Sequence, residues 1–336
     1  MSPILVYLAT LVVYFFIYNI FGFGLNIQFG YAGILDFAFI TFMAVGGYLY
    51  GAAALPHETP GSQIYYVLGL SWSFPLALLL GILGAGAVGA LVGLIALKRL
   101  RSDYLAIVTL ASGTLIYGVI GNFTRLFDGW EGLMGVPQPF TGALNLNANT
   151  FVLFFVLVSG VIMAILWFFA NRLYRSPLGR AMRAVREDID VAEAYGKNAF
   201  KLRMTAMVIG CIYAGIGGAL TIAFITALAP AGWSTGETFV IWALLLIGGR
   251  GNNLGAVVGS FLVAVLFTEA TRYLPAIGGN PNLIPDLRNI VIGVLLIVTL
   301  RFRPQGLVPE PKTNFFAVPL TSRVLRRVRH EEVVGA

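Results

Sequence analysis

Residues Ser176 to Leu220 read SPLGRAMRAVREDIDVAEAYGKNAFKLRMTAMVIGCIYAGIGGAL, and this stretch decides the fold. Its first half is the one long charged segment in an otherwise apolar sequence. Its second half is an apolar run that is long enough to span a membrane. A charged segment in this position is either a solvated loop or an element that a soluble partner holds.

The composition predicts a membrane protein. Of the 336 residues, 58% are hydrophobic and 11% are charged, whereas about 25% of the residues in a soluble domain are charged. Runs such as Pro3–Leu25 and Phe74–Leu97 exceed the roughly 20 apolar residues that cross a bilayer as a helix. We therefore expect an all-α, polytopic membrane protein with about eight hydrophobic segments.

Two of these segments, near residues 26–55 and 238–271, are interrupted by glycine and polar residues. Irregular backbone at membrane depth is tolerated only where protein or a water-filled cavity surrounds it, and paired interruptions point to a transport site. The predicted translocation path therefore consists of Gly30, Gly33, Asp36, Gly248, Gly249, Arg250 and Gly251.

Each interruption also has a plainer interpretation. Asp36 would be a helix cap or a buried hydrogen-bond partner, and Arg250 would mark a tight cytoplasmic turn between two short spans. For residues 26–55, either the N-terminus lies outside the cell or the segment is broken or re-entrant. No flanking Lys or Arg decides between these two topologies.

The placement of positive charge predicts which side of the membrane each loop occupies. No Lys or Arg precedes Lys98, and most of the later ones gather in three clusters, near residues 98–101, 172–203 and 301–329. The positive-inside rule places all three clusters, and therefore the C-terminus, in the cytoplasm. The formal net charge of +7 thus reflects membrane topology, and we expect no nucleic-acid partner.

The charged segment has the pattern of a folded element. Ser176 and Pro177 fit a helix N-cap followed by proline at the first helical position. Apolar residues then recur at spacings of three and four, which places them on one helical face. They are Leu178, Met182, Val185, Ile189 and Ala192.

Charged residues of this segment also have helical spacing. Opposite charges stand four residues apart at Arg183–Glu187, Arg186–Asp190 and Glu193–Lys197. Asp190 and Glu193 fit a capping box, so a second helix can begin there and stop at Gly196. The sequence leaves open whether the segment is one helix or two, but a merely solvated loop needs no apolar stripe.

Several activities have no motif in the chain. There is no phosphate-binding G-x-x-x-x-G-K-[ST] loop, no C-x-x-C, no H-E-x-x-H and no histidine cluster. We therefore expect no enzymatic activity, no metal site and no cofactor in this chain. A stand-alone channel or secondary carrier for a small polar solute, such as urea or an amide, is the alternative to an ATP-driven transporter. Ionisable groups within the apolar segments are sparse, which argues modestly against secondary transport.

The charged segment resembles the cytoplasmic signature SP-x-GRA-x-RA-x-R…AEA-x-G of LivM-like permease subunits of branched-chain amino acid ABC importers. Other stretches are also similar to that family: GYAGILDFAF near residue 30, RLRSDYLAIVTL near residue 100, LLIGGRGNNLGAVVGS near residue 250 and FRPQGLVP near residue 305. The likeness covers almost the whole chain. Departures from the family pattern, at Asp36, Phe39, Thr114 and Ala256, fall in segments expected to face the pathway.

The resemblance implies an importer in the inner membrane of a bacterial-type cell. Its implied partners are a second homologous permease, two ATP-binding subunits that bind ATP and Mg²⁺, and an extracytoplasmic solute-binding protein. The membrane domain would span residues 1–308, with a coupling element at 172–202 and a basic cytoplasmic tail at 309–336. The residues implied to meet the ATPase are Ser176, Pro177, Gly179, Arg180, Arg183, Arg186, Glu187, Asp190, Glu193 and Gly196.

Overall fold

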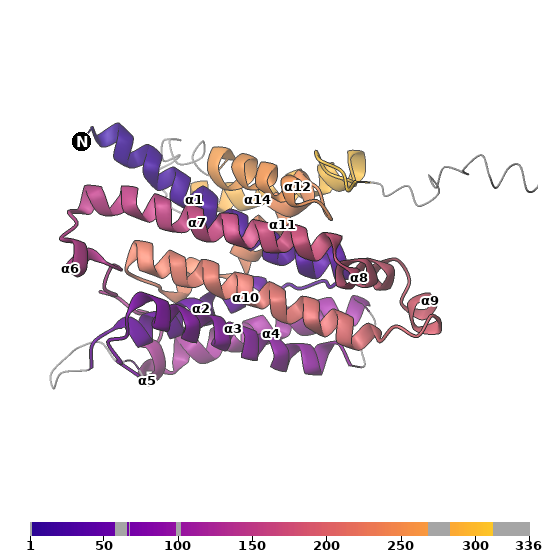
Figure 1. The fold of residues 1–336 in the computed structure, drawn as a ribbon, viewed down its shortest axis with the longest axis horizontal. Coiled ribbons are helices and arrows are strands. Elements are labelled where there is room, and N and C mark those ends of the chain that lie inside the picture. Colours follow the sequence, from indigo (N-terminus) through magenta and orange to yellow (C-terminus); the bar gives the residue numbers. More distant parts are fainter. Residues whose placement is uncertain (1, 58–65, 67, 99–101, 268–282, 312–336) are drawn as a thin grey trace, which may run out of the picture.

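A computed structural model describes residues 2–57, 66, 68–98, 102–267 and 283–311. Helices supply its regular structure and run mostly along one direction (Figure 1). They are α1 (Pro3–Leu25), η1 (Asn26–Tyr31), α2 (Phe39–Ala54), α3 (Phe74–Ala96), α4 (Ser102–Asn122), α5 (Thr124–Phe127), α6 (Thr141–Leu144), α7 (Ala148–Arg175), α8 (Pro177–Glu187), α9 (Ile189–Ala194), α10 (Ala199–Ile225), η2 (Pro230–Trp233), α11 (Thr235–Gly248), α12 (Asn253–Gly259), η3 (Ser260–Phe267) and α14 (Leu283–Phe302).

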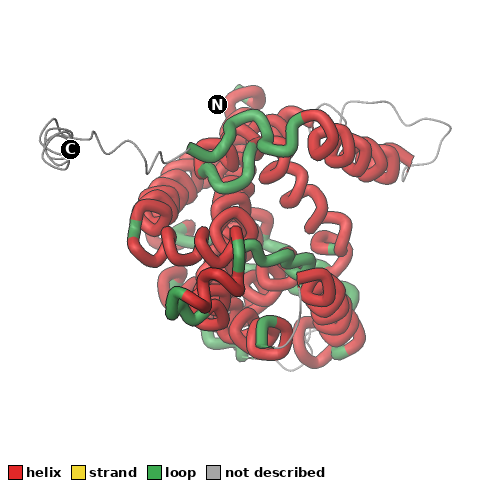
Figure 2. Tube along the Cα trace, turned by 90° about the vertical axis from the view of Figure 1, so that its right-hand side faces the viewer, coloured by secondary structure: helices red, strands yellow, loops and turns green. Residues whose placement is uncertain are grey.

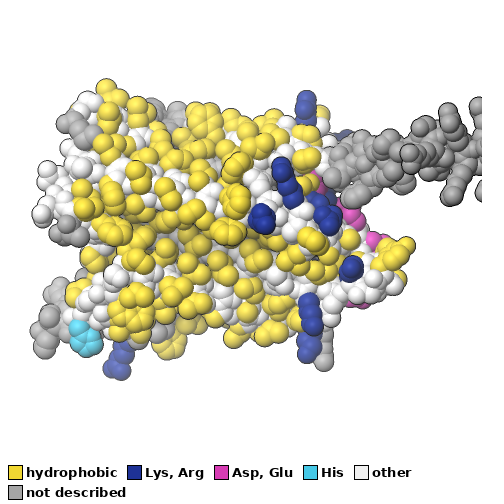
Figure 3. Space-filling view, in the orientation of Figure 1, with side chains coloured by type: hydrophobic (Ala, Val, Ile, Leu, Met, Phe, Trp, Pro, Cys, Tyr) yellow, Lys and Arg dark blue, Asp and Glu magenta, His cyan; other side chains and the backbone are white. Residues whose placement is uncertain are grey.

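The helices have the length and composition of a polytopic membrane protein, which confirms the predicted fold class. Among the described residues, six helices are long and apolar enough to cross a membrane, and three shorter apolar helices accompany them. Apolar side chains cover the body of the bundle along its length (Figure 3). The eight predicted segments do not correspond one to one with the helices of the structure. The predicted segment 238–271, for example, begins with two separate helices, α11 and α12.

The two ends of the bundle differ in charge. Helices α8 and α9 project from one end, here called the α8 end, and most of the visible Lys and Arg side chains gather there (Figures 1 and 3). The short helices α5 and α6 lie at the opposite end, here called the far end (Figure 1). Helix α1 begins at the far end, continues through the π-helical η1 and reaches the α8 end.

Small residues allow the central helices to approach one another closely. A Cβ atom added at Gly215 of α10 would lie 2.5 Å from Ala85 Cβ of α3, and one at Gly81 of α3 would lie 2.6 Å from the Gly46 carbonyl of α2. Close approach of this kind is how helices pack in lipid, where hydrophobic burial does not drive association. An end-on view shows the helices arranged around one another (Figure 2).

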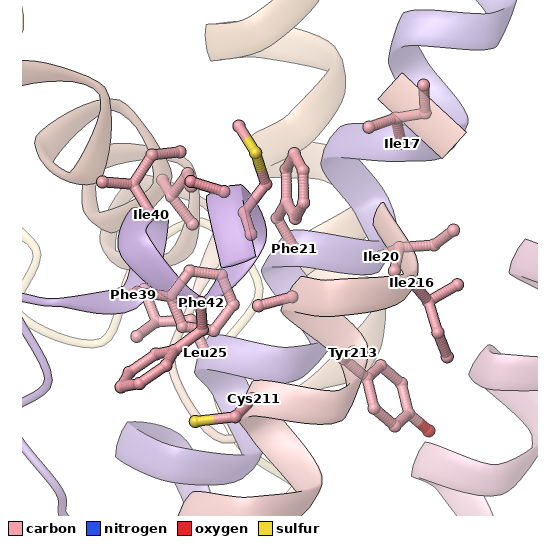
Figure 4. Close-up of a cluster of buried hydrophobic side chains, with 14 of the residues drawn as sticks. Ile17, Ile20, Phe21, Leu25, Phe39, Ile40, Phe42, Cys211, Tyr213 and Ile216 are labelled. Carbon is pink, nitrogen blue, oxygen red and sulfur yellow. The ribbon is translucent and has the colours of Figure 1, made fainter. Parts of the chain in front are cut away.

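The interior between α1, α2 and α10 is filled by apolar side chains (Figure 4). Phe21 of α1 and Phe39 of α2 meet edge to face, with ring centroids 6.4 Å apart. Cys211, the single cysteine of the sequence, is fully buried within α10, as expected for a cysteine that packs as a small hydrophobic residue.

The two predicted interruptions take different forms. After η1 the chain is irregular over residues 32–38 and then starts the 16-residue α2, which returns to the far end. The second interruption is a turn over residues 249–252 between α11 and α12, which lie side by side. A Cβ added at Gly255 would come within 2.9 Å of the Gly248 carbonyl. Arg250 therefore lies in a tight turn between two helices, and its place in the translocation path stays a prediction.

Candidate functional site

The charged segment forms two helices that meet at a bend. Ser176 caps α8, since its Oγ accepts a 3.1 Å hydrogen bond from the Gly179 amide, and Pro177 occupies the first helical position, as predicted. Asp188 ends α8 and caps α9, because its Oδ1 accepts a 3.0 Å hydrogen bond from the Val191 amide. The second helix thus starts at Asp188 and not at the predicted Asp190.

The apolar stripe fastens α8 and α9 to the rest of the bundle. Met182, Val185 and Ala192 are at most 4% exposed, and Val185 and Ala192 pack with Ala199 at the start of α10. Leu178 is the exception, because it is 37% exposed. Burial of the stripe shows that α8 and α9 are packed on the start of α10.

Arg186 turns toward the bundle and meets the first interrupted segment. Its Nη1 donates to the backbone carbonyl of Gly30, and its Nη2 donates to Glu310 at 2.9 Å and to Glu187 at 2.6 Å. Burial lowers the pKa of Arg186, but its bonds to Glu187 and Glu310 outweigh burial and leave the pKa raised. The guanidinium therefore stays charged and joins α8 to η1.

Arg183 lies beside Arg186 and shares the same acidic partner. Its guanidinium carbon stands 3.9 Å from the centre of the Tyr174 ring, and its Nε lies 4.0 Å from Glu310 Oε1. The Tyr174 hydroxyl donates to Glu310 Oε1 at 3.3 Å. The three predicted pairs four residues apart are absent from the ion pairs of the described residues, and Arg183 and Arg186 face Glu310 instead.

Residues Gln305–Glu310 follow α14 and form what we call the C-terminal strap. Its backbone runs against the turn between α11 and α12: the Leu307 amide donates to the Ile247 carbonyl at 2.9 Å, and the Val308 amide donates to the Gly248 carbonyl at 2.8 Å. Asn252 Nδ2 donates to the Pro309 carbonyl at 3.1 Å. No sequence pattern predicts this contact, since the strap lies within or next to the predicted tail.

A cluster of asparagines links the two interrupted segments directly. Asn26 of η1 accepts from the Gly251 amide at 2.8 Å and donates to Asn253 Oδ1 at 2.9 Å. The Tyr31 hydroxyl also donates to Asn253 Oδ1, at 2.8 Å, and Asn253 in turn donates to Asn171 of α7. Gly30, Gly33, Gly248, Gly249 and Gly251 are thus gathered at the α8 end, near Arg186 and Glu310.

The remaining coupling candidates face outward. Pro177, Arg180, Glu187, Asp190, Glu193 and Gly196 are exposed. Two apolar side chains that the sequence did not single out accompany them: Val191 of α9 is 51% exposed, and Tyr195, which caps the C-terminus of α9, is 82% exposed. An exposed aromatic residue among charges is typical of a surface that a protein partner covers.

Asp36 lies apart from the glycines, inside the bundle. It is fully buried, and its Oδ1 accepts a 2.9 Å hydrogen bond from the Ala38 amide at the start of α2. Its carbonyl accepts from Trp242 Nε1 at 3.0 Å. The helix-cap role of Asp36 is therefore present, whereas Asp36 Oδ2 has no hydrogen-bond partner among the described residues.

A narrow pocket lies beside the first interruption. It is bounded by α2, α4 and α11 and by η2, and it is lined by Phe37, Ile40, Thr41, Leu110, Gly113, Thr114, Tyr117, Trp233 and Thr238. Thr238 is fully buried, and its hydroxyl has no partner among the described residues. Apart from Thr114, the sequence pattern did not indicate these residues, because they come from four separate elements. No group of three or more potential metal-ligating side chains occurs in the described part of the chain.

Comparison with known proteins gives the site its context. Residues 7–300 match the model of the family described as branched-chain amino acid transport system / permease component. The permease protein LivM of the high-affinity branched-chain amino acid transport system of Escherichia coli K12 is 31% identical over 87% of this chain and 68% of its own length.

More distant relatives belong to other organisms. A probable branched-chain amino acid transport permease, LivM, of Methanocaldococcus jannaschii is 28% identical over 90% of this chain and 93% of its own length. The guanosine ABC transporter permease NupQ of Bacillus subtilis is 25% identical over 68% of this chain and 72% of its own length. No solved structure matches the chain. The chain belongs to the permease components of branched-chain amino acid transport systems.

Proposed function

We propose that the chain is the membrane-spanning permease subunit of an ATP-driven importer and forms half of its translocation pathway. Its solute would be a branched-chain amino acid or a related small polar compound, delivered by a soluble binding protein outside. The observation that carries this proposal is the α8–α9 element: a folded, outward-facing pair of helices on a chain of this family, fastened to the bundle on one face and exposed on the other.

The partners follow from what the chain lacks and from its relatives. A sequence without a phosphate-binding loop needs separate ATPase subunits, which would bind ATP and Mg²⁺. Methanocaldococcus jannaschii has two related permeases, named LivM and LivH, and both match this chain. We infer a second homologous permease beside this chain, two ATPases at the α8 end and a binding protein at the far end.

The orientation rests on the positive-inside rule. The α8 end carries the basic residues of α7, α8 and α14, so it would lie in the cytoplasm together with the C-terminus. The N-terminus would then lie outside, because α1 starts at the far end. Among the two topologies that the sequence left open, this is the one without a re-entrant segment. The membrane would be the inner membrane of a bacterial-type cell.

Movement of the ATPases would reach the pathway through buried contacts. Closure of the ATPases would displace α8 and α9, and the buried stripe would pass this displacement to α10. Arg186 would pass it to η1 through the Gly30 carbonyl. The predicted path residues would respond as two groups, with the glycines moving at the α8 end and Asp36 lining the interior.

Solute would meet the chain beside Asp36. The pocket next to the first interruption presents hydroxyl groups and aromatic rings but no charged side chain. The pocket holds about 10 Å³, the room of one water molecule, so it would have to widen during transport to admit a solute. The channel or carrier alternative gains no support from any observation on the described residues.

The outward face of α9 gives the sharpest test. Tyr195→Asp removes an exposed ring without disturbing a buried contact, whereas charge reversal at Arg183 or Arg186 would also break the contacts with Glu310 and Gly30. We expect Tyr195→Asp to abolish co-purification of the ATPase subunits while insertion into the membrane is unchanged.

The matched control is Phe302→Asp, which replaces another exposed aromatic residue, 78% exposed at the end of α14. This variant should retain the ATPase subunits. Stoichiometric ATPase co-purification with Tyr195→Asp would contradict the proposed docking surface. Uptake into proteoliposomes would then be measured with the complete assembly and with this chain alone. ATP-driven uptake by the complete assembly indicates an importer, whereas uptake by this chain alone indicates a channel or carrier.

A further inference from the structure

We propose that Glu310 is a positioning residue: it makes the turn between α11 and α12 follow the movement of α8. The inference rests on the proposed importer function and adds a mechanical link that neither the family relationship nor the sequence pattern assigns. Glu310 touches neither solute nor nucleotide in this account. It acts by holding together segments that are far apart in the sequence.

The carboxylate of Glu310 reaches α8 from outside that helix. It lies 2.9 Å from Arg186 Nη2 and 4.0 Å from Arg183 Nε, and it accepts from the Tyr174 hydroxyl. In the ion pairs of the described residues, the other carboxylate on Arg186 is Glu187, which is the next residue of the chain and is 72% exposed. Glu310 is 25% exposed, so water screens its ion pairs less than that of Glu187.

The backbone on the N-terminal side of Glu310 is bonded to the turn. Leu307 and Val308 donate to the last carbonyls of α11, and the Pro309 carbonyl accepts from Asn252. Gly306 and Gly249 both have positive φ angles, of 73° and 130°, and a Cβ at Gly306 would collide with the Gly249 backbone. The strap and the turn are therefore in direct backbone contact, and the turn cannot shift without moving the strap.

The turn is also tied to η1. The Gly251 amide donates to Asn26, and the same helical turn of η1 presents the Gly30 carbonyl to Arg186. Two routes consequently leave Arg186: one through Gly30 into η1, and one through Glu310 into the strap and the turn. Both routes end on interrupted segments, so Glu310 would keep the two interruptions moving together when α8 moves.

The test uses the complete transporter in proteoliposomes and measures solute uptake and ATP hydrolysis in the same preparation. For Glu310→Gln we expect the ATPase subunits to remain bound, ATP hydrolysis to stay within about twofold of the unsubstituted transporter, and uptake per ATP to fall at least about fivefold. Glu310→Asp keeps the charge and should restore most of the coupling. Glu131→Gln removes an exposed carboxylate at the far end and should leave the uptake per ATP unchanged.

A double-substitution cycle separates a link from a general structural role. Groups that act on one another give effects that do not add, whereas independent groups give additive free energies. Arg186→Gln together with Glu310→Gln should therefore lower the uptake per ATP no further than Arg186→Gln alone. Multiplied losses in the double variant would overturn the proposal, as would unchanged coupling in Glu310→Gln.

Failure of the link and failure of the proposed function give different results. If Glu310→Gln loses its ATPase subunits, Glu310 supports assembly rather than movement and the inference is overturned, but the importer stands. If the unsubstituted chain recruits no ATPase and imports nothing with ATP, the proposed function itself fails.

Discussion

The two interruptions of the membrane helices share a sequence signature but occupy different surroundings. Residues 32–38 lie inside the bundle, where Asp36 is fully buried, whereas residues 249–252 form a turn at the α8 end, where Arg250 is exposed. Within the bundle, side chains must satisfy the irregular backbone: the Phe37 amide donates to Thr109, and Trp242 donates to the Asp36 carbonyl. At the α8 end, the C-terminal strap bonds the last carbonyls of α11, and the Asn26 side chain accepts from the Gly251 amide.

This difference teaches where each interruption can act. Backbone groups deprived of water cost several kcal/mol unless they are paired, so the inner interruption is fixed by side chains that converge from α4 and α11. The outer interruption is held by the C-terminal strap and by Asn26, and the strap in turn bonds Arg186 of α8 through Glu310. The inner one suits contact with solute and the outer one suits transmission of movement.

The largest effect is expected where the outer turn meets the strap. Gly249 has φ +130°, and a Cβ there would collide with the Val308 carbonyl. We expect Gly249→Ala to destabilise the chain by the conformational strain, about 1–3 kcal/mol, and by the displacement of the strap in addition. Thermal unfolding of the purified chain in detergent measures this loss. An unchanged unfolding midpoint would show that the strap does not hold the turn.

The inner interruption depends on the carboxylate that caps α2. Asp36→Ala leaves the buried Ala38 amide without its acceptor, which costs about 1–3 kcal/mol. Asp36→Asn keeps an acceptor oxygen, so its unfolding midpoint should stay close to that of the native chain. If the two variants have the same unfolding midpoint, the hydrogen bond to Ala38 contributes little to the stability of the chain. We also expect Asp36→Asn to lower solute uptake, which would separate a role in the pathway from the role as a cap.

A smaller effect is expected at Gly33, near the start of the inner interruption. Its φ angle of 67° costs a residue with a Cβ about 1–2 kcal/mol. The added Cβ would lie 3.1 Å from Arg186 Cγ, and this flexible side chain can shift slightly. Gly33→Ala should therefore lower the free energy of unfolding by about 1–2 kcal/mol, which denaturation of the purified chain can measure. A loss as large as that of Gly249→Ala would show that the stability of the chain depends equally on the two interruptions.

The smallest effect is expected at Arg250. Its side chain is exposed in the outer turn, and exposed substitutions away from special backbone usually change stability by less than about 0.5 kcal/mol. Arg250→Gln should unfold like the native chain in the same assay. A large destabilisation would show that the Arg250 side chain makes a stabilising contact, contrary to its exposure in the structure.

Local signals predicted local structure well. Ser176 and Pro177 start α8 as expected, because an N-cap followed by proline is complete within one helical turn. The apolar stripe predicted the buried face, since helical spacing alone decides it. The cap of the second helix was predicted at Asp190 although Asp188 performs it: Asp190 and Glu193 match the capping-box spacing, whereas Asp188 acts without a glutamate three residues later.

Contacts between distant residues could not be predicted in this way. Asn26 bonds Asn253 across 227 positions, and Arg186 bonds Glu310 across 124. Spacing rules see neither pair, so Arg183 and Arg186 were assigned to partners on their own helix. The same limit explains why the sequence could not place the glycines of the predicted path at the α8 end, beside Arg186 and Glu310. That these glycines belong to the translocation path remains a prediction.

The most direct test of the account asks on which side of the membrane α9 lies and what covers it. Two single substitutions, Tyr195→Cys on α9 and Glu131→Cys at the far end, provide exposed thiols, and the native Cys211 is fully buried. Each variant would be treated with a membrane-impermeant maleimide, in intact cells and in inverted vesicles with and without the ATPase subunits.

We expect the thiol at position 131 to react in intact cells. The thiol at position 195 should react only in inverted vesicles, and bound ATPase should protect it. Reaction at position 195 from outside the cell, or equal reaction with and without ATPase, would contradict the claim that α8 and α9 are the cytoplasmic element through which ATP hydrolysis moves this permease.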